Sequence, residues 1–213
     1  EEGAQTSGKT ITLNVYNWGE YISDGSLDSL DVNKAFEEYC YEEYGLNVVV
    51  NYSTYPTNED MYSKLKYGAA SYDIVIPSDY MIERMISEDL LAPLDTSKIP
   101  NYEYIDEKFK GDNIYYEGDS DKLYSVPYFY GMIGIIYNSE IVDEADASAE
   151  SWDLMWNEKY SRDILQFNNS RDAFGTALYK LGYDVNTATD EQWNEALLLL
   201  KDQKDLVQGY VMD

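Results

Sequence analysis

The chain has 213 residues, of which 44% are hydrophobic and 15% aromatic, so it can bury a substantial core and is not expected to be disordered. Its 15 Lys and Arg residues face 41 Asp and Glu residues, which gives a formal net charge of −26. A field of this sign repels nucleic acid and anionic membrane surfaces and attracts cationic ligands. There is no His and a single Cys, Cys40, which excludes histidine-based catalysis, an internal disulfide and any metal site built from several cysteines.

The sequence shows no membrane-spanning run and no targeting segment. No apolar stretch approaches the roughly 18 residues of a membrane helix, and no secretory signal pattern opens the chain. Residues 1–10 are interpreted as a polar tail, as expected after processing of a secreted precursor. Cys40 lies within a helical pattern and is expected to be a buried, inert thiol, because no His is present to activate it. Composition alone leaves the compartment open.

The first part of the chain alternates strand patterns with helix patterns. Gly45 follows one helical pattern and Thr57 precedes the next, which are typical helix-ending and helix-capping positions. Because such alternation builds parallel sheets through right-handed crossovers, we predict a mostly parallel sheet. The predicted strands are 11–16, 47–53 and 73–76, and the predicted helices are 27–44, 57–67 and a segment that follows Tyr80 and ends near Leu90.

Residues 101–121 interrupt this alternation. They are rich in acidic residues and show no apolar period, so they are interpreted as a solvated excursion. The acidic residues do not follow the order of an EF-hand loop. Two further strands are predicted at 123–127 and 131–138.

A second α/β segment begins at Ser151, which is expected to open a helix. Thr189 and Gln192 have the spacing of a capping box at the start of a later helix. No helical pattern follows the last predicted strand, so this segment looks unfinished. The predicted helices are 151–160, 169–181 and 189–203, and the predicted strands are 163–167 and 206–212.

Three of the predicted strands are followed by side chains that suit ligand binding. Ligands of open parallel sheets bind beyond the carboxyl ends of the strands. Aromatic faces attract ammonium groups and carboxylates bond to them directly, so these positions favour a cationic ligand. The candidates are Trp18, Glu20 and Tyr21 after the first strand, Ser78, Asp79 and Tyr80 after the third, and Asn168, Asn169 and Asp172 after the strand at 163–167.

Most of these candidates also have a purely structural interpretation. Trp18 and Tyr21 fit a role as core aromatics, and Ser78 fits a role as the cap of the following helix. Asn169 and Asp172 are three residues apart at a helix start, which matches a capping box with Asp in place of Glu or Gln. Their shared location at strand ends is what favours a functional interpretation.

Sequence motifs of common enzymes are missing. The chain has no G-x-S-x-G, P-loop, G-x-G-x-x-G or H-E-x-x-H motif. A glycosidase would use paired carboxylates, but among 41 acidic residues such pairs arise by chance. A ligand with a carboxylate would normally require an Arg clamp, and of the Arg residues just Arg171 lies near a candidate loop.

Several segments carry family-specific motifs. The most specific are N-W-x-E-Y within Val15–Tyr21 and D-x-V-x-P-S within Tyr72–Ser78. The others are Tyr52–Tyr55 followed by Asn58 and Glu59, Val126–Tyr128, Ser151–Leu154 and Arg171–Phe174. In this order, from about residue 11 to the end, the chain resembles the spermidine/putrescine-binding proteins of polyamine ABC importers.

The resemblance implies an α/β fold of the periplasmic-binding-protein type (type II). This fold has two lobes with mostly parallel sheets, flanking helices and hinge crossover strands. Residues 11–127 would form an incomplete first lobe, and residues 128–213 would form part of the second. Members of the family continue well beyond this length, so the chain is expected to be truncated.

The resemblance also implies roles for the candidates of the first lobe. Trp18 and Tyr21 resemble residues that pack on the hydrocarbon chain of the polyamine. Glu20 resembles an acid that meets an amino group, and Ser78 and Tyr80 resemble further contacts of this lobe.

In the second lobe, Asp172 resembles an acid that reaches across the cleft between the lobes. Asn169 stands where spermidine binders tend to carry an Asp, so the choice between spermidine and putrescine stays open. The implied function is capture of a polyamine in the interlobe cleft and delivery to a membrane ABC permease, without chemistry, cofactor or metal. The alternatives are a sugar-binding ABC receptor with an aromatic platform and, more remotely, a carboxylate-pair glycosidase.

The same resemblance implies an extracytoplasmic location. The protein would lie in the periplasm or be lipid-anchored at the outer face of the membrane in a Gram-positive bacterium. Neither a nucleic-acid partner nor direct membrane insertion of this chain is expected.

Overall fold

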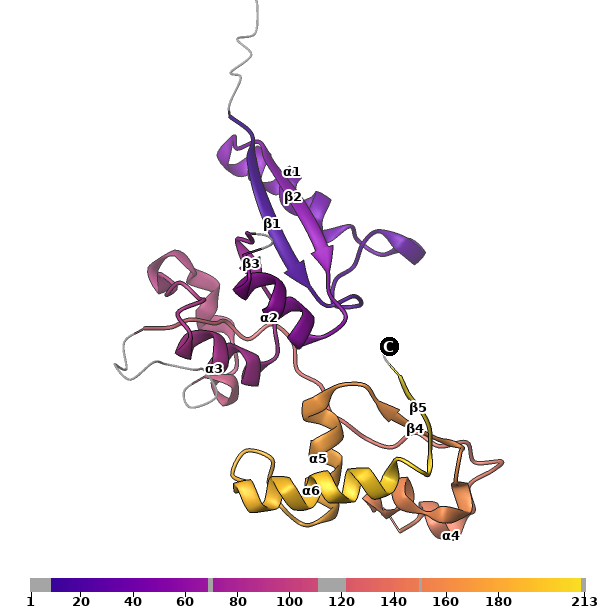
Figure 1. Ribbon diagram of the computed structural model, residues 1–213. Coiled ribbons are helices and arrows are strands. Elements are labelled where there is room, and N and C mark those ends of the chain that lie inside the picture. The colour runs from indigo at the N-terminus through magenta and orange to yellow at the C-terminus, as the bar shows by residue number, and fades with distance from the viewer. Residues whose placement is uncertain (1–8, 69–70, 111–121, 150, 212–213) are drawn as a thin grey trace, which may run out of the picture. The chain divides into compact units, whose positions relative to one another are not determined.

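The computed structural model describes residues 9–68, 71–110, 122–149 and 151–211, and the chain divides into two units, Glu1–Tyr130 and Gly131–Asp213 (Figure 1). Each unit contains one parallel sheet with helices beside it, which confirms the predicted α/β class. Of the predicted polar tail, the described residues are Lys9 and Thr10, and both are exposed. Residues 1–8 lie outside the described part of the chain.

The sheet of the first unit has three strands. These are β1 (Ile11–Asn17), β2 (Val48–Thr54) and β3 (Ile74–Val75), in the order β2-β1-β3. Both pairs are parallel, with Val15 opposite Tyr52 on one side and opposite Ile74 on the other. Because the strands run in one direction, the segments that follow them leave the sheet at the same edge, and this edge carries the first-unit candidates.

Three helices of the first unit connect and flank these strands: α1 (Val32–Tyr44), α2 (Asn58–Lys66) and α3 (Asp79–Ser87). The Thr57 side chain accepts the backbone N–H of Asp60 at 3.1 Å, which confirms the predicted cap of α2. Gly45 ends α1 with a left-handed φ of 65°, a conformation that glycine adopts without a steric penalty. In Figure 1, α1 lies behind β1 and β2.

The prediction that the first helix begins at Leu27 is wrong. Ser26–Asp28 form a separate 3₁₀ turn in which Leu27 has a left-handed φ of 49°. The helix starts only after Asp31, whose side chain accepts the backbone N–H of Lys34 at 3.0 Å. The apolar residue at position 27 matched the helical period, but the local cap at Asp31 decides where the helix begins.

Tyrosine and methionine side chains build the core of the first unit. Methionine is flexible enough to fill the irregular spaces that flat aromatic rings leave between them. Cys40 is also buried, with 6% of its surface exposed, as predicted. The core cluster consists of Tyr16, Tyr55, Met61, Tyr62, Met81 and Met85.

The strands predicted at 123–127 and 131–138 are not found: neither segment belongs to a sheet formed by the described residues. The Leu123 carbonyl accepts the backbone N–H of Leu94 at 2.7 Å, but no ladder continues from this contact. Ile136 is fully exposed. An alternating apolar pattern becomes a strand only where a neighbouring strand supplies a ladder of hydrogen-bond partners, and among the described residues no strand pairs with either segment.

The acid-rich segment 101–121 is described in part. Pro100–Tyr104 and Glu107–Phe109 form short 3₁₀ turns, and most of their residues are exposed or half-buried. Residues 111–121 lie outside the described residues. The described portion therefore has the solvated, irregular character that the sequence predicts.

The second unit has a two-stranded parallel sheet and two longer helices that pack against each other (Figure 1). Thr189 and Gln192 form the predicted capping box, with both reciprocal hydrogen bonds present. The elements are α4 (Glu144–Ala147), β4 (Ile164–Phe167), α5 (Ser170–Lys180), α6 (Asp190–Gln203) and β5 (Val207–Val211).

The helix predicted at 151–160 is replaced by two 3₁₀ turns, Trp152–Trp156 and Glu158–Tyr160. Ser151 does cap the first turn, because its hydroxyl accepts the backbone N–H of Asp153 at 3.1 Å. Asn157 then adopts an extended conformation (φ −79°, ψ 112°) and caps the second turn through its own side chain. This competition between an Asn side chain and the helical backbone breaks the segment in two.

A buried polar network joins the sheet of the second unit to its helices. The Gln166 amide donates to Thr176 Oγ1 at 3.2 Å and to Gln203 Oε1 at 3.3 Å. The Gln203 amide in turn donates to the Met155 carbonyl at 3.0 Å. Because buried amides are costly when unpaired, these bonds fix β4 relative to α5 and α6, and so hold the start of α5 in place.

An ionic cluster between α2 and α3 makes the stability of the first unit depend on pH. Glu88 lies 2.8 Å from the Lys66 ammonium and accepts the Tyr62 hydroxyl at 2.5 Å, and Lys66 in particular lowers the pKa of Glu88 to about 2. A carboxylate with a lowered pKa stabilises the fold above its ordinary pKa of 4.5 and loses that contribution as the pH falls toward 2. We therefore expect the melting temperatures of the wild type and Glu88→Gln to differ most near neutral pH and to converge between pH 4.5 and pH 2. A difference that is constant over this range would contradict the assignment.

Candidate ligand-binding site

Aromatic side chains form a continuous row at the carboxyl edge of the first-unit sheet. The ring centroids of Tyr16 and Tyr55 are 5.0 Å apart, and those of Tyr55 and Trp18 are 4.8 Å apart. Tyr21 follows at 6.3 Å from Trp18, and Phe129 lies 5.0 Å from Tyr21 in an edge-to-face arrangement. These distances are those of interacting rings. Tyr16 and Tyr55 are buried in the core, so the accessible part of the row consists of the half-buried Trp18 and Tyr21 and the exposed Phe129.

Two predicted site residues, Trp18 and Tyr21, belong to this row. Trp18 packs against the buried core cluster but is itself only half-buried, so its role as a core aromatic and a role in binding are compatible. The Tyr21 carbonyl accepts a hydrogen bond from the Tyr128 hydroxyl, which fixes the loop after β1. Glu20 lies between them in sequence, is exposed, and makes no hydrogen bond or ion pair with another described residue. Its carboxylate is therefore available to a cation.

Tyr55 lies between Tyr16 and Trp18 in the row and was not among the predicted site residues. It is 3% exposed, and its hydroxyl donates to the Ile76 carbonyl at 2.5 Å, which joins the end of β2 to the segment after β3. Burial raises the pKa of the Tyr55 phenol well above its ordinary value, so the hydroxyl stays a donor. The rule that directs attention to strand ends applies equally to the end of β2 and would have found it.

Ser78 and Tyr80 lie at the same edge, at the start of α3. Ser78 occupies the N-cap position of α3, as the capping interpretation predicts, but its side chain makes no capping hydrogen bond. Asn58 links the two residues: its Oδ1 accepts the Ser78 backbone N–H at 3.1 Å and its Nδ2 donates to the Tyr80 hydroxyl at 2.9 Å. Tyr80 also lies 3.4 Å from a Glu59 carboxylate oxygen. Asn58 and Glu59 are further residues of this edge that were not predicted as site residues.

The two candidates of the second unit share the first turn of α5. Asn169 is the N-cap, and its Oδ1 accepts the backbone N–H groups of Arg171 and Asp172 at 3.0 and 3.3 Å, which confirms the Asn169 part of the predicted capping arrangement. Asp172 is half-buried beside it, where the positive end of the helix dipole favours a carboxylate. The Arg171 guanidinium donates to Asn186 at 3.0 Å and lies 5.8 Å from the Trp193 ring centre. The Arg171 guanidinium thus interacts with residues of its own unit.

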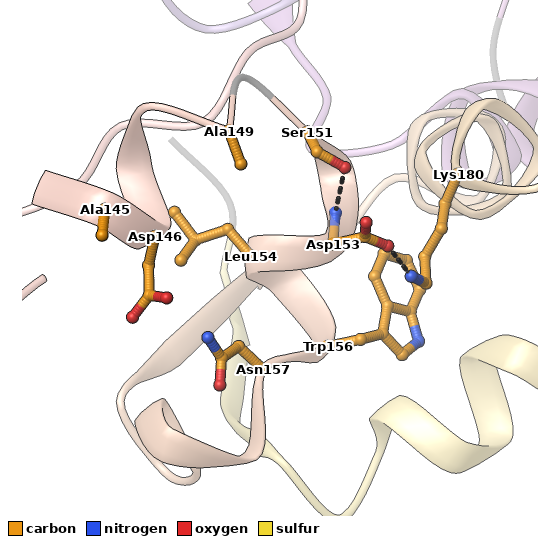
Figure 2. Close-up of a pocket in the computed structure, with 9 residues that line it drawn as sticks. All are labelled: Ala145, Asp146, Ala149, Ser151, Asp153, Leu154, Trp156, Asn157 and Lys180. Carbon is orange, nitrogen blue, oxygen red and sulfur yellow. Dashed lines mark hydrogen bonds and ion pairs between the residues drawn. The ribbon is translucent and has the colours of Figure 1, made fainter. Parts of the chain in front are cut away.

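A pocket of about 350 Å³ lies elsewhere in the second unit and contains none of the predicted site residues (Figure 2). Its polar groups are paired with one another or with neighbours: Ser151 accepts from the Asp153 backbone, Asp153 pairs with Lys180, and Asp146 pairs with Lys159. A site whose charges are already neutralised internally offers little to a charged ligand.

The described residues also limit the classes of site that the structure can contain. Among them, no group of three or more Cys, Asp or Glu side chains is arranged to hold a metal ion. Within the same residues, no helix has both the length and the apolar character that crossing a membrane requires.

Comparisons with known proteins identify the class of protein to which this α/β fold belongs. Residues 33–212 match the family described as bacterial extracellular solute-binding protein, and the chain belongs to this family. Members of this family bind solutes and are not enzymes.

The resemblance to polyamine-binding proteins is also confirmed. The chain is 35% identical over 191 residues, 89% of its length, to the spermidine/putrescine-binding periplasmic protein of Salmonella typhimurium, and it covers 50% of that protein. It superimposes on a putative spermidine/putrescine ABC transporter from Listeria monocytogenes with a TM-score of 0.71 and 34% identity, over 94% of this chain and 56% of that one.

It also superimposes on a lipoprotein of Treponema pallidum with a TM-score of 0.73 and 30% identity, over 93% of this chain and 57% of that one. The chain thus spans about half the length of the relatives it matches.

Proposed function

We propose that the protein is the receptor of an ABC importer and that it captures a polyamine, spermidine or putrescine. The observation that carries this proposal is the row of aromatic rings at the edge of the first-unit sheet, with the exposed Glu20 between Trp18 and Tyr21 in the sequence. The Salmonella and Listeria relatives, whose names refer to spermidine and putrescine, support the same ligand class.

The chemistry of a polyamine matches these groups one by one. Its methylenes would pack on the faces of Trp18 and Tyr21, and an ammonium group would pair with Glu20. Ser78 and Tyr80 would supply further contacts in the first unit. Each of these interactions is non-covalent, so binding is reversible and needs no catalytic group.

The second unit would complete recognition of the same ligand through Asp172. We propose that ligand binding between the two lobes shifts the protein to a closed form, which a membrane permease then recognises. Such a receptor works outside the cytoplasm, in the periplasm or anchored by a lipid at the outer face of the membrane. The family description and the periplasmic relative support this location.

A thermal-shift panel tests the ligand class. Spermidine and putrescine at millimolar concentration should raise the melting temperature, because a ligand that binds only the folded state stabilises it by mass action. Neutral sugars such as glucose and maltose at the same concentration should leave it unchanged. A shift with a sugar and none with either polyamine would replace the proposal by the sugar-receptor alternative.

Asn169 offers a test of ligand choice. Asn169→Asp keeps an oxygen that can cap α5 and adds a negative charge at the position where spermidine binders tend to carry Asp. We expect this variant to bind spermidine about 3- to 10-fold more tightly than the wild type, with a smaller gain for putrescine. The control Asn169→Ser keeps the cap without the charge and should leave both affinities within about twofold. Equal effects of Asp and Ser would show that Asn169 acts only as a cap.

A further inference from the structure

Asn58 is a fully buried amide at the start of α2, with 0% of its surface exposed. Both ends of this amide are used. Its Oδ1 accepts the Ser78 backbone N–H at 3.1 Å, and its Nδ2 donates to the Tyr80 hydroxyl at 2.9 Å. A buried amide that is bonded at both ends holds its partners rigidly, because moving either one leaves a polar group unpaired.

The direction of these hydrogen bonds follows from their chemistry. A backbone N–H can only donate, so the oxygen of the Asn58 amide must face Ser78 and its nitrogen must face Tyr80. The Tyr80 oxygen therefore accepts, and the hydrogen of its hydroxyl is directed to another acceptor. That acceptor is Glu59 Oε1, which lies 3.4 Å from the Tyr80 hydroxyl oxygen. Asn58 thus sets both the place and the orientation of the Tyr80 hydroxyl.

Asn58 also holds Ser78, the N-cap residue of α3, through its backbone. An N-cap serine usually bonds to the backbone of its own helix, but the Ser78 hydroxyl makes no such bond. Instead, Asn58 anchors the Ser78 backbone from outside α3. Ser78 is thus held at the start of α3 through its backbone, and its hydroxyl is not used to cap the helix.

We propose that Asn58 is a positioning residue of the ligand site: without touching the ligand, it holds Ser78 and Tyr80 in the arrangement that binds the polyamine. This inference rests on the proposed function for the ligand, but the positioning itself is a property of the free protein. The two parts can therefore be tested separately.

The first experiment measures positioning without any ligand. 3-Fluorotyrosine is placed at position 80 of the full chain, and its ¹⁹F resonance is recorded with Asn58 present and in Asn58→Ala. Loss of the bond should shift and broaden the resonance. Asn51→Ala, an exposed Asn of β2, is the matched control and should leave it unchanged. A resonance that Asn58→Ala leaves unchanged would overturn the proposal. If Asn58→Ala does not fold, Asn58→Asp replaces it, since that variant keeps an acceptor for Ser78 and loses the donor to Tyr80.

The second experiment is a double-mutant cycle with spermidine as the probe, at a temperature well below the melting point of every variant. Asn58→Ala should weaken binding about 10-fold and Tyr80→Phe about 3- to 10-fold. The double variant should bind within about twofold of Asn58→Ala, because part of the effect of Asn58 passes through Tyr80. Fully additive losses, or an Asn58→Ala variant that is merely less stable with unchanged affinity, would overturn the proposal. If the wild type binds neither spermidine nor putrescine, the proposed function fails, and the ¹⁹F result still decides whether Asn58 positions Tyr80.

Discussion

Replacing Glu20 by Gln and Asp172 by Asn in one chain should lower the affinity for spermidine and putrescine by at least about 100-fold. Glu20 is exposed and unpaired among the described residues, and Asp172 lies in the first turn of α5. In a polyamine receptor these carboxylates supply the charge that the ammonium groups require. In a carboxylate-pair glycosidase the same double change would abolish turnover and leave substrate binding largely intact. Calorimetric titration of the double variant distinguishes the two.

The matched control for this double variant is Glu42→Gln with Asp202→Asn. It removes the same two charges from exposed positions of α1 and α6 that are not among the candidates. Long-range attraction of a cation is reduced equally in both double variants, so only direct contacts distinguish them. Equal losses of affinity in the two would contradict the assignment of Glu20 and Asp172 as ligand contacts.

The substitution Leu178→Ala should destabilise the second unit by about 3 kcal/mol, within the 2–5 kcal/mol typical of buried Leu→Ala changes. Leu178 is 0% exposed and packs in a cluster with Ala177, Ala196 and Leu200, where α5 meets α6. The cavity left by the lost side chain cannot close without moving α5. Because α5 carries Asp172 in its first turn, the affinity for polyamine should fall as well.

Leu198→Ala provides the comparison, because it is the same substitution in a helix of the same unit at a residue that is 60% exposed. We expect it to change the free energy of unfolding by less than about 1 kcal/mol. Chemical denaturation monitored by circular dichroism measures both variants. Similar losses at the two positions would show that the α5–α6 interface is not the core of this unit.

Local features of the fold could be predicted from the sequence with accuracy. The Thr189–Gln192 capping box and the Asn169 cap involve residues two to three positions apart, so their hydrogen bonds depend on little beyond the helix itself. The alternation of strands and helices likewise predicted parallel pairing in both units. The strand-end rule then directed attention to Trp18 and Tyr21.

Features that depend on distant partners could not be predicted. The run at 131–138 has a strand-like composition, but a strand requires a neighbour that no local pattern reveals. In the sequence, Asn58 resembles any polar first residue of a helix. Its hydrogen bonds are made to Ser78 and Tyr80, which the packing of α2 near α3 brings beside it. Tyr55 directly follows β2, so the strand-end rule applies to it, but its burial between Tyr16 and Trp18 depends on the neighbouring strand β1.

Titration calorimetry of spermidine and of putrescine into the chain, at low and at moderate salt, tests the central claim most directly. The account predicts saturable binding of at least one polyamine, with an affinity that falls as salt rises, because a chain of net charge −26 attracts a polycation in part at long range. Saturable, salt-insensitive binding of a neutral sugar, with no heat from either polyamine at millimolar concentration, would contradict it.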